Sequence, residues 1–269
     1  MPAESAFCSG GSMDISLIET LRWEPATGFV RLERHLARLS RSAEALGLAG
    51  ADGARRALFA ALPPSALPGI SPSGGEIEWS SVSPIVGVAG ERGSGPLPIS
   101  PPEGEMPGRA EGGEPRATPI RIRLELFADG RIDVQTAPFT PLAADTSWRL
   151  KIATTRLSST DPLLRHKTSR RAAYAAARAE TPAAEAEEVL LLNERGELCE
   201  GTITSLFLDD GAGVLKTPPL GCGLLAGVLR EELLEGGKAI EAALRPEDLS
   251  RGAIFVGNSL RGLIRCGLS

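Results

Sequence analysis

Apolar and polar residues repeat with clear periods at the start of the chain. Residues 15–23 form a largely apolar run that predicts a β-strand. From Arg31 to Leu46 the leucines and alanines recur at intervals of three and four, which predicts an amphipathic helix, and Gly47 is placed to cap its end. A second helix is expected over residues 52–62, because two prolines follow it directly and cannot continue a helix.

The next stretch loses this periodicity. Between Ser71 and Thr118 roughly half of the residues are Gly, Pro or Ser, which is the composition of a flexible insert, and we expect no chemistry there. Residues 121–127 and 131–137 then alternate polar with apolar side chains around an Ala-Asp-Gly turn, which predicts a β-hairpin.

The second half of the chain predicts alternating strands and helices. Expected strands cover residues 148–157, 188–192, 202–208 and 254–256, and expected helices cover 169–179 and 224–234, with a turn at 193–196 and a polar loop at 257–259. Together these patterns predict a mixed α/β (α+β) chain in two domains. Residues 1–145 would form a small N-terminal domain that carries the insert at 71–118, and residues 146–269 a larger C-terminal one, with the boundary between Pro138 and Thr146.

Composition narrows the classes of function. The chain has 269 residues and a net charge of -5, and no stretch gathers basic residues with aromatic ones, so we expect no nucleic-acid partner. No window is apolar enough for a membrane span and the start does not resemble a leader peptide, so a cytoplasmic protein is expected. The 4 cysteines lack the close spacing of a zinc site, and we expect no metal.

Lys167 is the first candidate for chemistry. It lies in the segment LLRHKTSRRAAY, just before the helix expected at 169–179. The field of a helix start would lower the pKa of this lysine, as would the positive neighbours at 165, 166, 170 and 171. A lysine that forms a Schiff base needs a pKa near about 7 to 8. The alternative is an ordinary surface lysine.

Two further segments carry polar or glycine-rich features. In NERGELCEGTITSLFL, Glu200 could face a ring nitrogen and keep it protonated. The hydroxyls of Thr202 and Thr204 could bind a phosphate or Glu200 itself. The alternative is a hairpin with an exposed carboxylate. In TPPLGCGLLAGVLR, Gly227 precedes a helix whose first N–H groups could bind a phosphate.

In combination with the helix RLERHLARL, these segments resemble the class IV aminotransferases over about residues 17–268, apart from the insert. The resemblance implies a two-domain fold of the D-amino acid aminotransferase type, a homodimer, and pyridoxal 5′-phosphate bound to Lys167 as a Schiff base. Glu200 would face the pyridine nitrogen, and Arg38 would bind the phosphate through charge-assisted hydrogen bonds worth roughly 1.5 to 3 kcal/mol. The full cofactor-binding set that we expect is Arg38, Lys167, Glu200, Thr202, Ile203, Thr204, Gly227, Val228, Leu229, Asn258 and Ser259.

Within that family the motifs IETLRW, TITSLFL and GNSLRGLIR most resemble the aminodeoxychorismate lyase branch. Such a lyase converts 4-amino-4-deoxychorismate, a small amino substrate, to 4-aminobenzoate, a folate precursor, and pyruvate. Ser205 stands where the family often has asparagine, which leaves no side-chain amide at that position. Arg261 is a candidate to bind a substrate carboxylate, or else to form a structural salt bridge.

Two alternatives to the lyase stay open. One is a branched-chain or D-amino acid aminotransferase that passes the amino group to a 2-oxo acid, although Tyr174 does not have the spacing from the lysine seen in branched-chain enzymes. The other is a binding module without catalysis. An argument against it is that the chain has Arg38, Lys167 and Glu200 together. We interpret His35 and Tyr174 as packing residues, and assign His166 no proton transfer.

Overall fold

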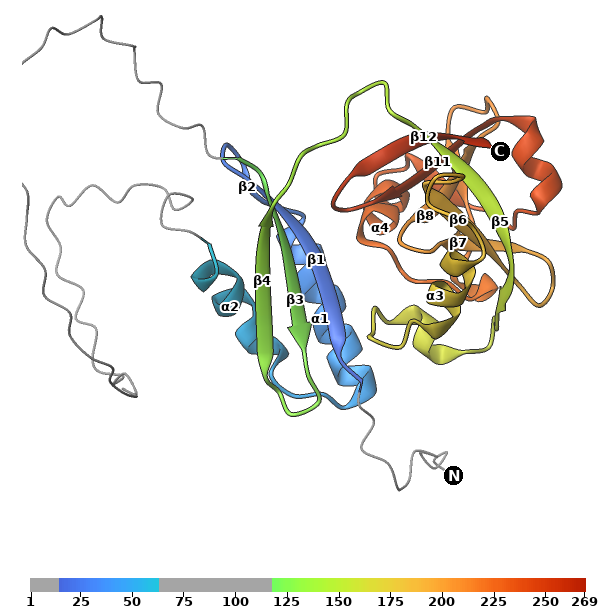
Figure 1. Ribbon diagram of the computed structural model, residues 1–269. Helices are drawn as coiled ribbons and strands as arrows, with labels where there is room; N and C mark the ends of the chain where they lie inside the picture. Colours follow the sequence, from blue (N-terminus) through green and yellow to red (C-terminus); the bar gives the residue numbers. More distant parts are fainter. Residues whose placement is uncertain (1–14, 63–117) are drawn as a thin grey trace, which may run out of the picture. The chain divides into compact units, whose positions relative to one another are not determined.

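The computed structural model describes residues 15–62 and 118–269 (Figure 1). Almost all of the predicted insert lies outside these residues. The first sheet has four antiparallel strands in the order β2-β1-β3-β4. They are β1 (Leu17–Glu24), β2 (Gly28–Val30), β3 (Ile120–Leu126) and β4 (Ile132–Pro138). The predicted first strand and the predicted hairpin are therefore confirmed.

Two helices cover one face of this sheet (Figure 1). They are α1 (Leu32–Leu46) and α2 (Ala54–Ala60), which a 3-10 turn, η1 (Ala51–Gly53), precedes. The first helix is confirmed, and Gly47 ends it in the left-handed conformation at φ 68°, where glycine has no Cβ to clash. The buried leucines and isoleucine of the layer between, such as Leu21, Leu39 and Ile122, stabilise it by roughly 1.5 to 3 kcal/mol each.

The second sheet has eight strands in the order β10-β9-β8-β11-β12-β5-β6-β7, and β7 also pairs with β8, so that the sheet returns on itself. β5 runs parallel to both β6 and β12, whereas β8 and β11 are antiparallel. The strands are β5 (Ser147–Leu157), β6 (Glu188–Asn193), β7 (Leu198–Gly201), β8 (Ser205–Asp209), β9 (Leu215–Thr217), β10 (Ala239–Glu241), β11 (Ala253–Asn258) and β12 (Gly262–Leu268).

Short helices surround this sheet. They are α3 (Ala172–Ala179), α4 (Val228–Glu235) and the 3-10 turns η3 (Pro162–Arg165), η4 (Leu220–Cys222) and η5 (Pro246–Arg251). Every residue of β6 is buried, as its apolar run predicts for a strand covered on both faces. Among the helices of the described residues, none combines the length and apolar character that crossing a bilayer requires.

The mixed helix and strand class is confirmed, and the differences concern where elements begin. The helices expected from residues 169 and 224 start at Ala172 and Val228, and the strand expected from 202 starts at Ser205. β2, β9, β10 and β12 were not predicted, because they are short or mix apolar residues with Gly and Arg. The proposed domain boundary falls between β4 and β5 and stays a prediction.

Candidate active site

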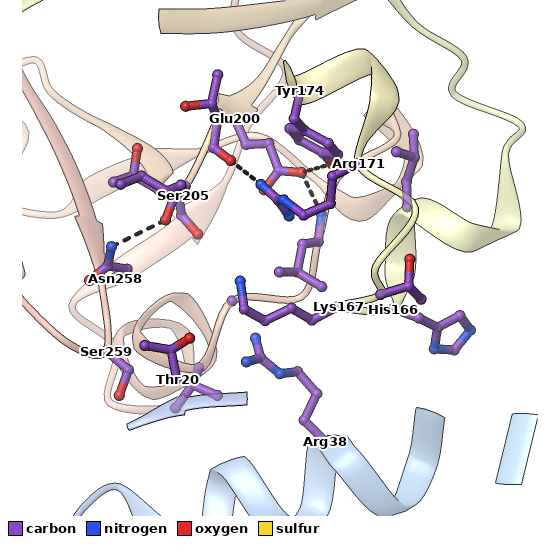
Figure 2. Close-up of a pocket in the computed structure, with 18 of the residues that line it drawn as sticks. Thr20, Arg38, His166, Lys167, Arg171, Tyr174, Glu200, Ser205, Asn258 and Ser259 are labelled. Atoms are coloured by element: carbon purple, nitrogen blue, oxygen red, sulfur yellow. Dashed lines mark hydrogen bonds between the residues drawn. The ribbon is translucent and has the colours of Figure 1, made fainter. Parts of the chain in front are cut away.

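A cavity of about 750 Å³ collects the predicted site residues. Its walls include Thr20, His35 and Arg38 from the first sheet and its helix, and a larger set from the second half of the chain (Figure 2). Every residue of the predicted cofactor set lines it, as does Arg261. Positions more than 200 residues apart in the sequence, such as Arg38 and Ser259, therefore contribute to one space.

Lys167 lies in an extended segment between η3 and α3 that runs along β1. Its carbonyl oxygen accepts a hydrogen bond of 2.7 Å from the Ile18 N–H, and Thr168 forms a bridge with Leu17. The expected place at a helix start is wrong, since α3 begins only at Ala172. The extended backbone instead anchors the lysine to the first sheet and directs its side chain into the cavity (Figure 2).

The Lys167 amine has a lowered pKa, as predicted, and Arg171 is one of the predicted positive neighbours that contribute to it. Burial is the main cause, and the positive charges of Arg38 and Arg171 add to it, so that the pKa falls to about 8. Arg165 is exposed and does not line the cavity. Within the described residues the Lys167 ammonium has no hydrogen-bond partner, which leaves it available to a ligand.

Glu200 lies on β7 with its side chain buried, so the exposed hairpin carboxylate is ruled out. Its Oε1 accepts hydrogen bonds from the Tyr174 hydroxyl, 2.6 Å away, and from the Leu225 N–H, 3.0 Å away. Burial raises the pKa of Glu200 to about 7, although these two donors and Arg171 oppose the shift. Oε2 has no partner in the described part of the chain and remains free for a ligand.

Tyr174 is a site residue that the sequence reasoning took for a packing residue. Besides its hydrogen bond to Glu200, its ring lies 4.4 Å from the Arg171 guanidinium, a cation–π contact. Burial and the Glu200 charge raise the pKa of the Tyr174 hydroxyl, so it stays a donor. One signal could have found it: it is the single tyrosine of the chain and stands in a helix of small residues close to Lys167.

The loop at residues 202–204 corrects another expectation. The hydroxyls of Thr202 and Thr204 do not bind Glu200 and are not free for a phosphate. They donate to the carboxylate of Glu188, at 2.5 and 2.8 Å. The N–H groups of Thr202 and Ile203 bind the same carboxylate at 3.0 and 3.1 Å. Glu188, which the sequence reasoning did not single out, is fully buried and thus determines the shape of this cavity wall.

The glycine-rich segment before α4 lines the cavity through Gly227 and the first residues of the helix. The N–H groups of Val228 and Leu229 stand in the first turn of α4, where no helical carbonyl can accept them. At Gly227 a Cβ would lie 2.5 Å from the Ser205 Oγ, so a larger residue there would require the Ser205 hydroxyl to move. Arg38 reaches this segment through a 3.1 Å hydrogen bond to the Ala226 carbonyl.

The β11–β12 turn supplies the remaining predicted residues. The Asn258 side chain donates to the Ile203 carbonyl at 3.1 Å and accepts from the Arg261 N–H at 3.0 Å. Its amide therefore connects the β11–β12 turn to the loop at residues 202–204. The Arg261 guanidinium lies 5.9 Å from the Trp148 ring, and its pKa is lowered by burial and by the charge of Arg121. Arg261 forms no ion pair with a described residue, and its role in binding a substrate carboxylate stays a prediction.

Comparisons with known proteins identify the family of the chain. Residues 110–267 match the family model "Amino-transferase class IV". A crystal structure of a "Putative amino-acid aminotransferase" from Mesorhizobium loti is 43% identical, covers 95% of this chain and 100% of its own, and has a TM-score of 0.71.

Two curated relatives are similar over shorter stretches. A "Putative aminodeoxychorismate lyase" of Schizosaccharomyces pombe is 33% identical over 150 residues, 52% of this chain and 63% of the relative. A "Probable branched-chain-amino-acid aminotransferase" of Thermotoga maritima is 32% identical over 126 residues, 45% and 44% of the two chains. The chain thus matches less than two thirds of the length of either relative. The family model, the 43% identity along the whole Mesorhizobium chain and the shared mixed α/β fold establish that this protein is an enzyme of the class IV aminotransferase family, whose members use pyridoxal 5′-phosphate.

Proposed function

We propose that this enzyme binds pyridoxal 5′-phosphate in the cavity, with Lys167 as the point of attachment. Three observations support the fit: a lysine amine without a hydrogen-bond partner among the described residues, a buried carboxylate with Oε2 unpartnered, and unpaired N–H groups beside an arginine. When bound, the coenzyme supplies an aldehyde for condensation with amines and a pyridine ring that withdraws electrons.

Each proposed ligand-binding group has a defined task. Arg38, the Val228 and Leu229 N–H groups and Ser259 would bind the phosphate, since a helix start and a guanidinium both favour an anion. Glu200 would accept a hydrogen bond from the protonated pyridine nitrogen through Oε2. The pKa of Glu200 is about 7. The Tyr174 hydroxyl and the Leu225 N–H lower it against the effect of burial, and this lowering favours the ionised carboxylate that this role needs.

Lys167 would act as the base. With a pKa of about 8, roughly a tenth of the free amine is neutral at pH 7, whereas an ordinary lysine would be almost wholly charged. The neutral amine can take a proton from the substrate carbon and return it elsewhere. Arg38 and Arg171 maintain this neutral fraction by repelling the charged form.

For the reaction itself, we favour the lyase: 4-amino-4-deoxychorismate would be converted to 4-aminobenzoate and pyruvate. That substrate carries two carboxylates, and the cavity lining includes Arg121 and Arg261, neither of which forms an ion pair with an acidic side chain of the described residues. Arg261 would bind one carboxylate, as a planar guanidinium suits that anion. The similarity to the Schizosaccharomyces protein supports the same choice.

An aminotransferase that acts on a branched-chain or D-amino acid is the second candidate. The relative from Mesorhizobium, which is similar along its whole length, is named as an aminotransferase, and the relative from Thermotoga as a branched-chain one. The same coenzyme site serves both reactions. They differ in whether a 2-oxo acid is needed to complete the cycle.

Two experiments test these proposals in order. Borohydride reduction followed by peptide mass mapping should find the coenzyme attached at Lys167, and no reduced adduct there would refute the coenzyme proposal. The loaded enzyme is then supplied with aminodeoxychorismate and no 2-oxo acid. Formation of 4-aminobenzoate and pyruvate supports the lyase, whereas turnover only with an amino acid plus 2-oxoglutarate supports the aminotransferase.

The resemblance also leads us to propose a homodimer in the cytoplasm. Light scattering on the purified protein should give twice the 28.1 kDa mass of the chain. A monomer that retained full activity would contradict the dimer.

A further inference from the structure

Glu19, on β1, is a buried carboxylate behind the proposed phosphate site. Its Oε1 accepts a hydrogen bond from Arg38 Nε at 2.9 Å, and its Oε2 accepts one from Arg38 Nη2 at 2.6 Å. Its side chain is about 4% exposed, and it is not among the residues that line the cavity. Despite the burial, Arg38 and His35 lower the pKa of Glu19 to about 2, so the carboxylate is ionised.

The two bonds from Glu19 determine which donors of Arg38 remain. A guanidinium has five N–H groups in one plane, and a carboxylate bound at Nε and Nη2 occupies one edge of it. One Nη1 hydrogen goes to the Ala226 carbonyl at 3.1 Å. One hydrogen on Nη1 and one on Nη2 are left, and they belong to a side chain that lines the cavity.

Glu19 also reaches the β11–β12 turn through His35. Glu19 Oε2 lies 2.6 Å from His35 Nδ1, and His35 Nε2 lies 2.8 Å from the Ser259 Oγ. A carboxylate only accepts, so Nδ1 carries a hydrogen. The contact between His35 Nε2 and the Ser259 Oγ is the next hydrogen bond of the chain, and it holds the Ser259 side chain in one orientation.

We propose that Glu19 is a positioning residue for the coenzyme phosphate: it orients the Arg38 guanidinium toward the phosphate and, through His35, holds the Ser259 side chain beside it, while Glu19 itself does not touch the phosphate. The inference rests on the proposed coenzyme site. His35 then has a defined task and is more than a packing residue. Glu19, Arg38, His35 and Ser259 act as one hydrogen-bonded unit drawn from a strand, a helix and a distant turn.

The test compares two aldehydes that differ only in the phosphate. The apoenzyme and its Glu19→Gln variant are titrated with pyridoxal 5′-phosphate and with pyridoxal, and the dissociation constant is read from the absorbance of the adduct, with borohydride mapping to Lys167. Loss of a supporting partner typically weakens ligand binding on the order of 10- to 100-fold. We expect that loss for pyridoxal 5′-phosphate and less than about a threefold change for pyridoxal.

Glu125 provides a matched control, because it is an acid on the same sheet that pairs with an arginine, Arg123, away from Arg38. Glu125→Gln should change neither constant. An equal loss for both aldehydes in Glu19→Gln, or no loss, would overturn the inference. Failure of the unaltered enzyme to form an adduct with either aldehyde would instead overturn the coenzyme proposal.

Glu19→Asp serves if circular dichroism finds Glu19→Gln unfolded. It keeps the charge that Arg38 needs but is one carbon shorter, so it cannot hold both Arg38 and His35 at the same distances. The same phosphate-specific loss is expected, at a smaller fold-change, and its absence would equally overturn the inference.

Discussion

The pKa of Glu200 is held near 7 by a balance between burial, which raises it, and two donors, Tyr174 and Leu225, which lower it. Tyr174→Phe removes one donor while keeping the ring beside Arg171. A hydrogen bond to a charged group is worth roughly 1.5 to 3 kcal/mol, so the pKa should rise by about one unit. The carboxylate then forms only at higher pH, and the acidic limb of the activity profile should move upward. Measured kcat against pH checks this; an unmoved limb would show that Tyr174 only packs.

We expect Lys167 to lower the unfolding free energy of the apoenzyme. Its pKa is about 8 in the folded chain and 10.5 in the unfolded one. Below pH 8 both states are protonated and the full cost is present; between pH 8 and 10.5 the folded chain loses its proton first and the cost disappears. Each unit of pKa difference corresponds to about 1.4 kcal/mol, so Lys167→Met should stabilise the apoenzyme at pH 7 by at most about 3 kcal/mol. Screening of the charge by solvent in the cavity makes this gain smaller.

Urea unfolding at pH 7 and at pH 10.5 measures this difference. The gain from Lys167→Met should be present at the lower pH and nearly absent at the higher. Lys238→Met, at an exposed lysine, is the control and should show no such pH dependence. A gain that is equal at both values would mean that the lysine is not destabilised by its surroundings.

At the scale of elements, Glu188 joins the start of β6 to the loop that connects β7 with β8. Its carboxylate accepts hydrogen bonds from the N–H and the hydroxyl of Thr202 and from the hydroxyl of Thr204. Glu188→Ala would leave these buried donors without an acceptor, which costs about 1 to 3 kcal/mol for each group that cannot turn to water. We expect a loss of at least about 3 kcal/mol in chemical unfolding, whereas Thr204→Val, which removes a single donor, should cost about 1 kcal/mol. If both variants lost a similar amount of unfolding free energy, this would contradict the inference that Glu188 is the shared acceptor that holds this loop.

Arg31, directly before α1, and Arg34, in its first turn, pair with glutamates of α4. Arg34 binds Glu235 at 2.6 Å, and Arg31 binds Glu232 at 2.6 Å. These pairs are partly exposed, so each should contribute at most about 1 kcal/mol. Arg34→Glu should lower the unfolding free energy by about that amount at low salt, and adding Glu235→Arg should restore it. A double variant that is no more stable than the single one would contradict the pairing.

For the molecule as a whole, the predicted insert should be dispensable. Replacing residues 71–118 with a short Gly-Ser linker should leave coenzyme binding unchanged, because every predicted site residue lies elsewhere in the sequence. Shortening a flexible connection changes its closure entropy by only about 0.6 kcal/mol per halving of length. Titration with pyridoxal 5′-phosphate and a thermal melt check this. Loss of binding with an unchanged melt would assign the insert a part in the site.

Much of the fold was predictable because the signal is local. Helix α1 has a strong period and a glycine cap, and the β3–β4 hairpin has strict alternation around a turn. β12 was missed since its sequence, GLIRCGL, is strand-like only where β5 and β11 pair with it on either side. The start of α3 was misplaced because the pairing of Thr168 with Leu17 holds the chain extended where Ala-rich propensity alone would favour helix.

Sequence by itself determined the class of chain, its family resemblance and which residue types could do the chemistry, since composition, period and motif order are properties of the chain as written. Only the tertiary structure decided what those residues contact. The partner of Glu200 is Tyr174, that of the threonines is Glu188, and that of Arg38 is Glu19. Burial and charge depend on neighbours brought together by folding, so no local pattern could have set the pKa values of Lys167 and Glu200.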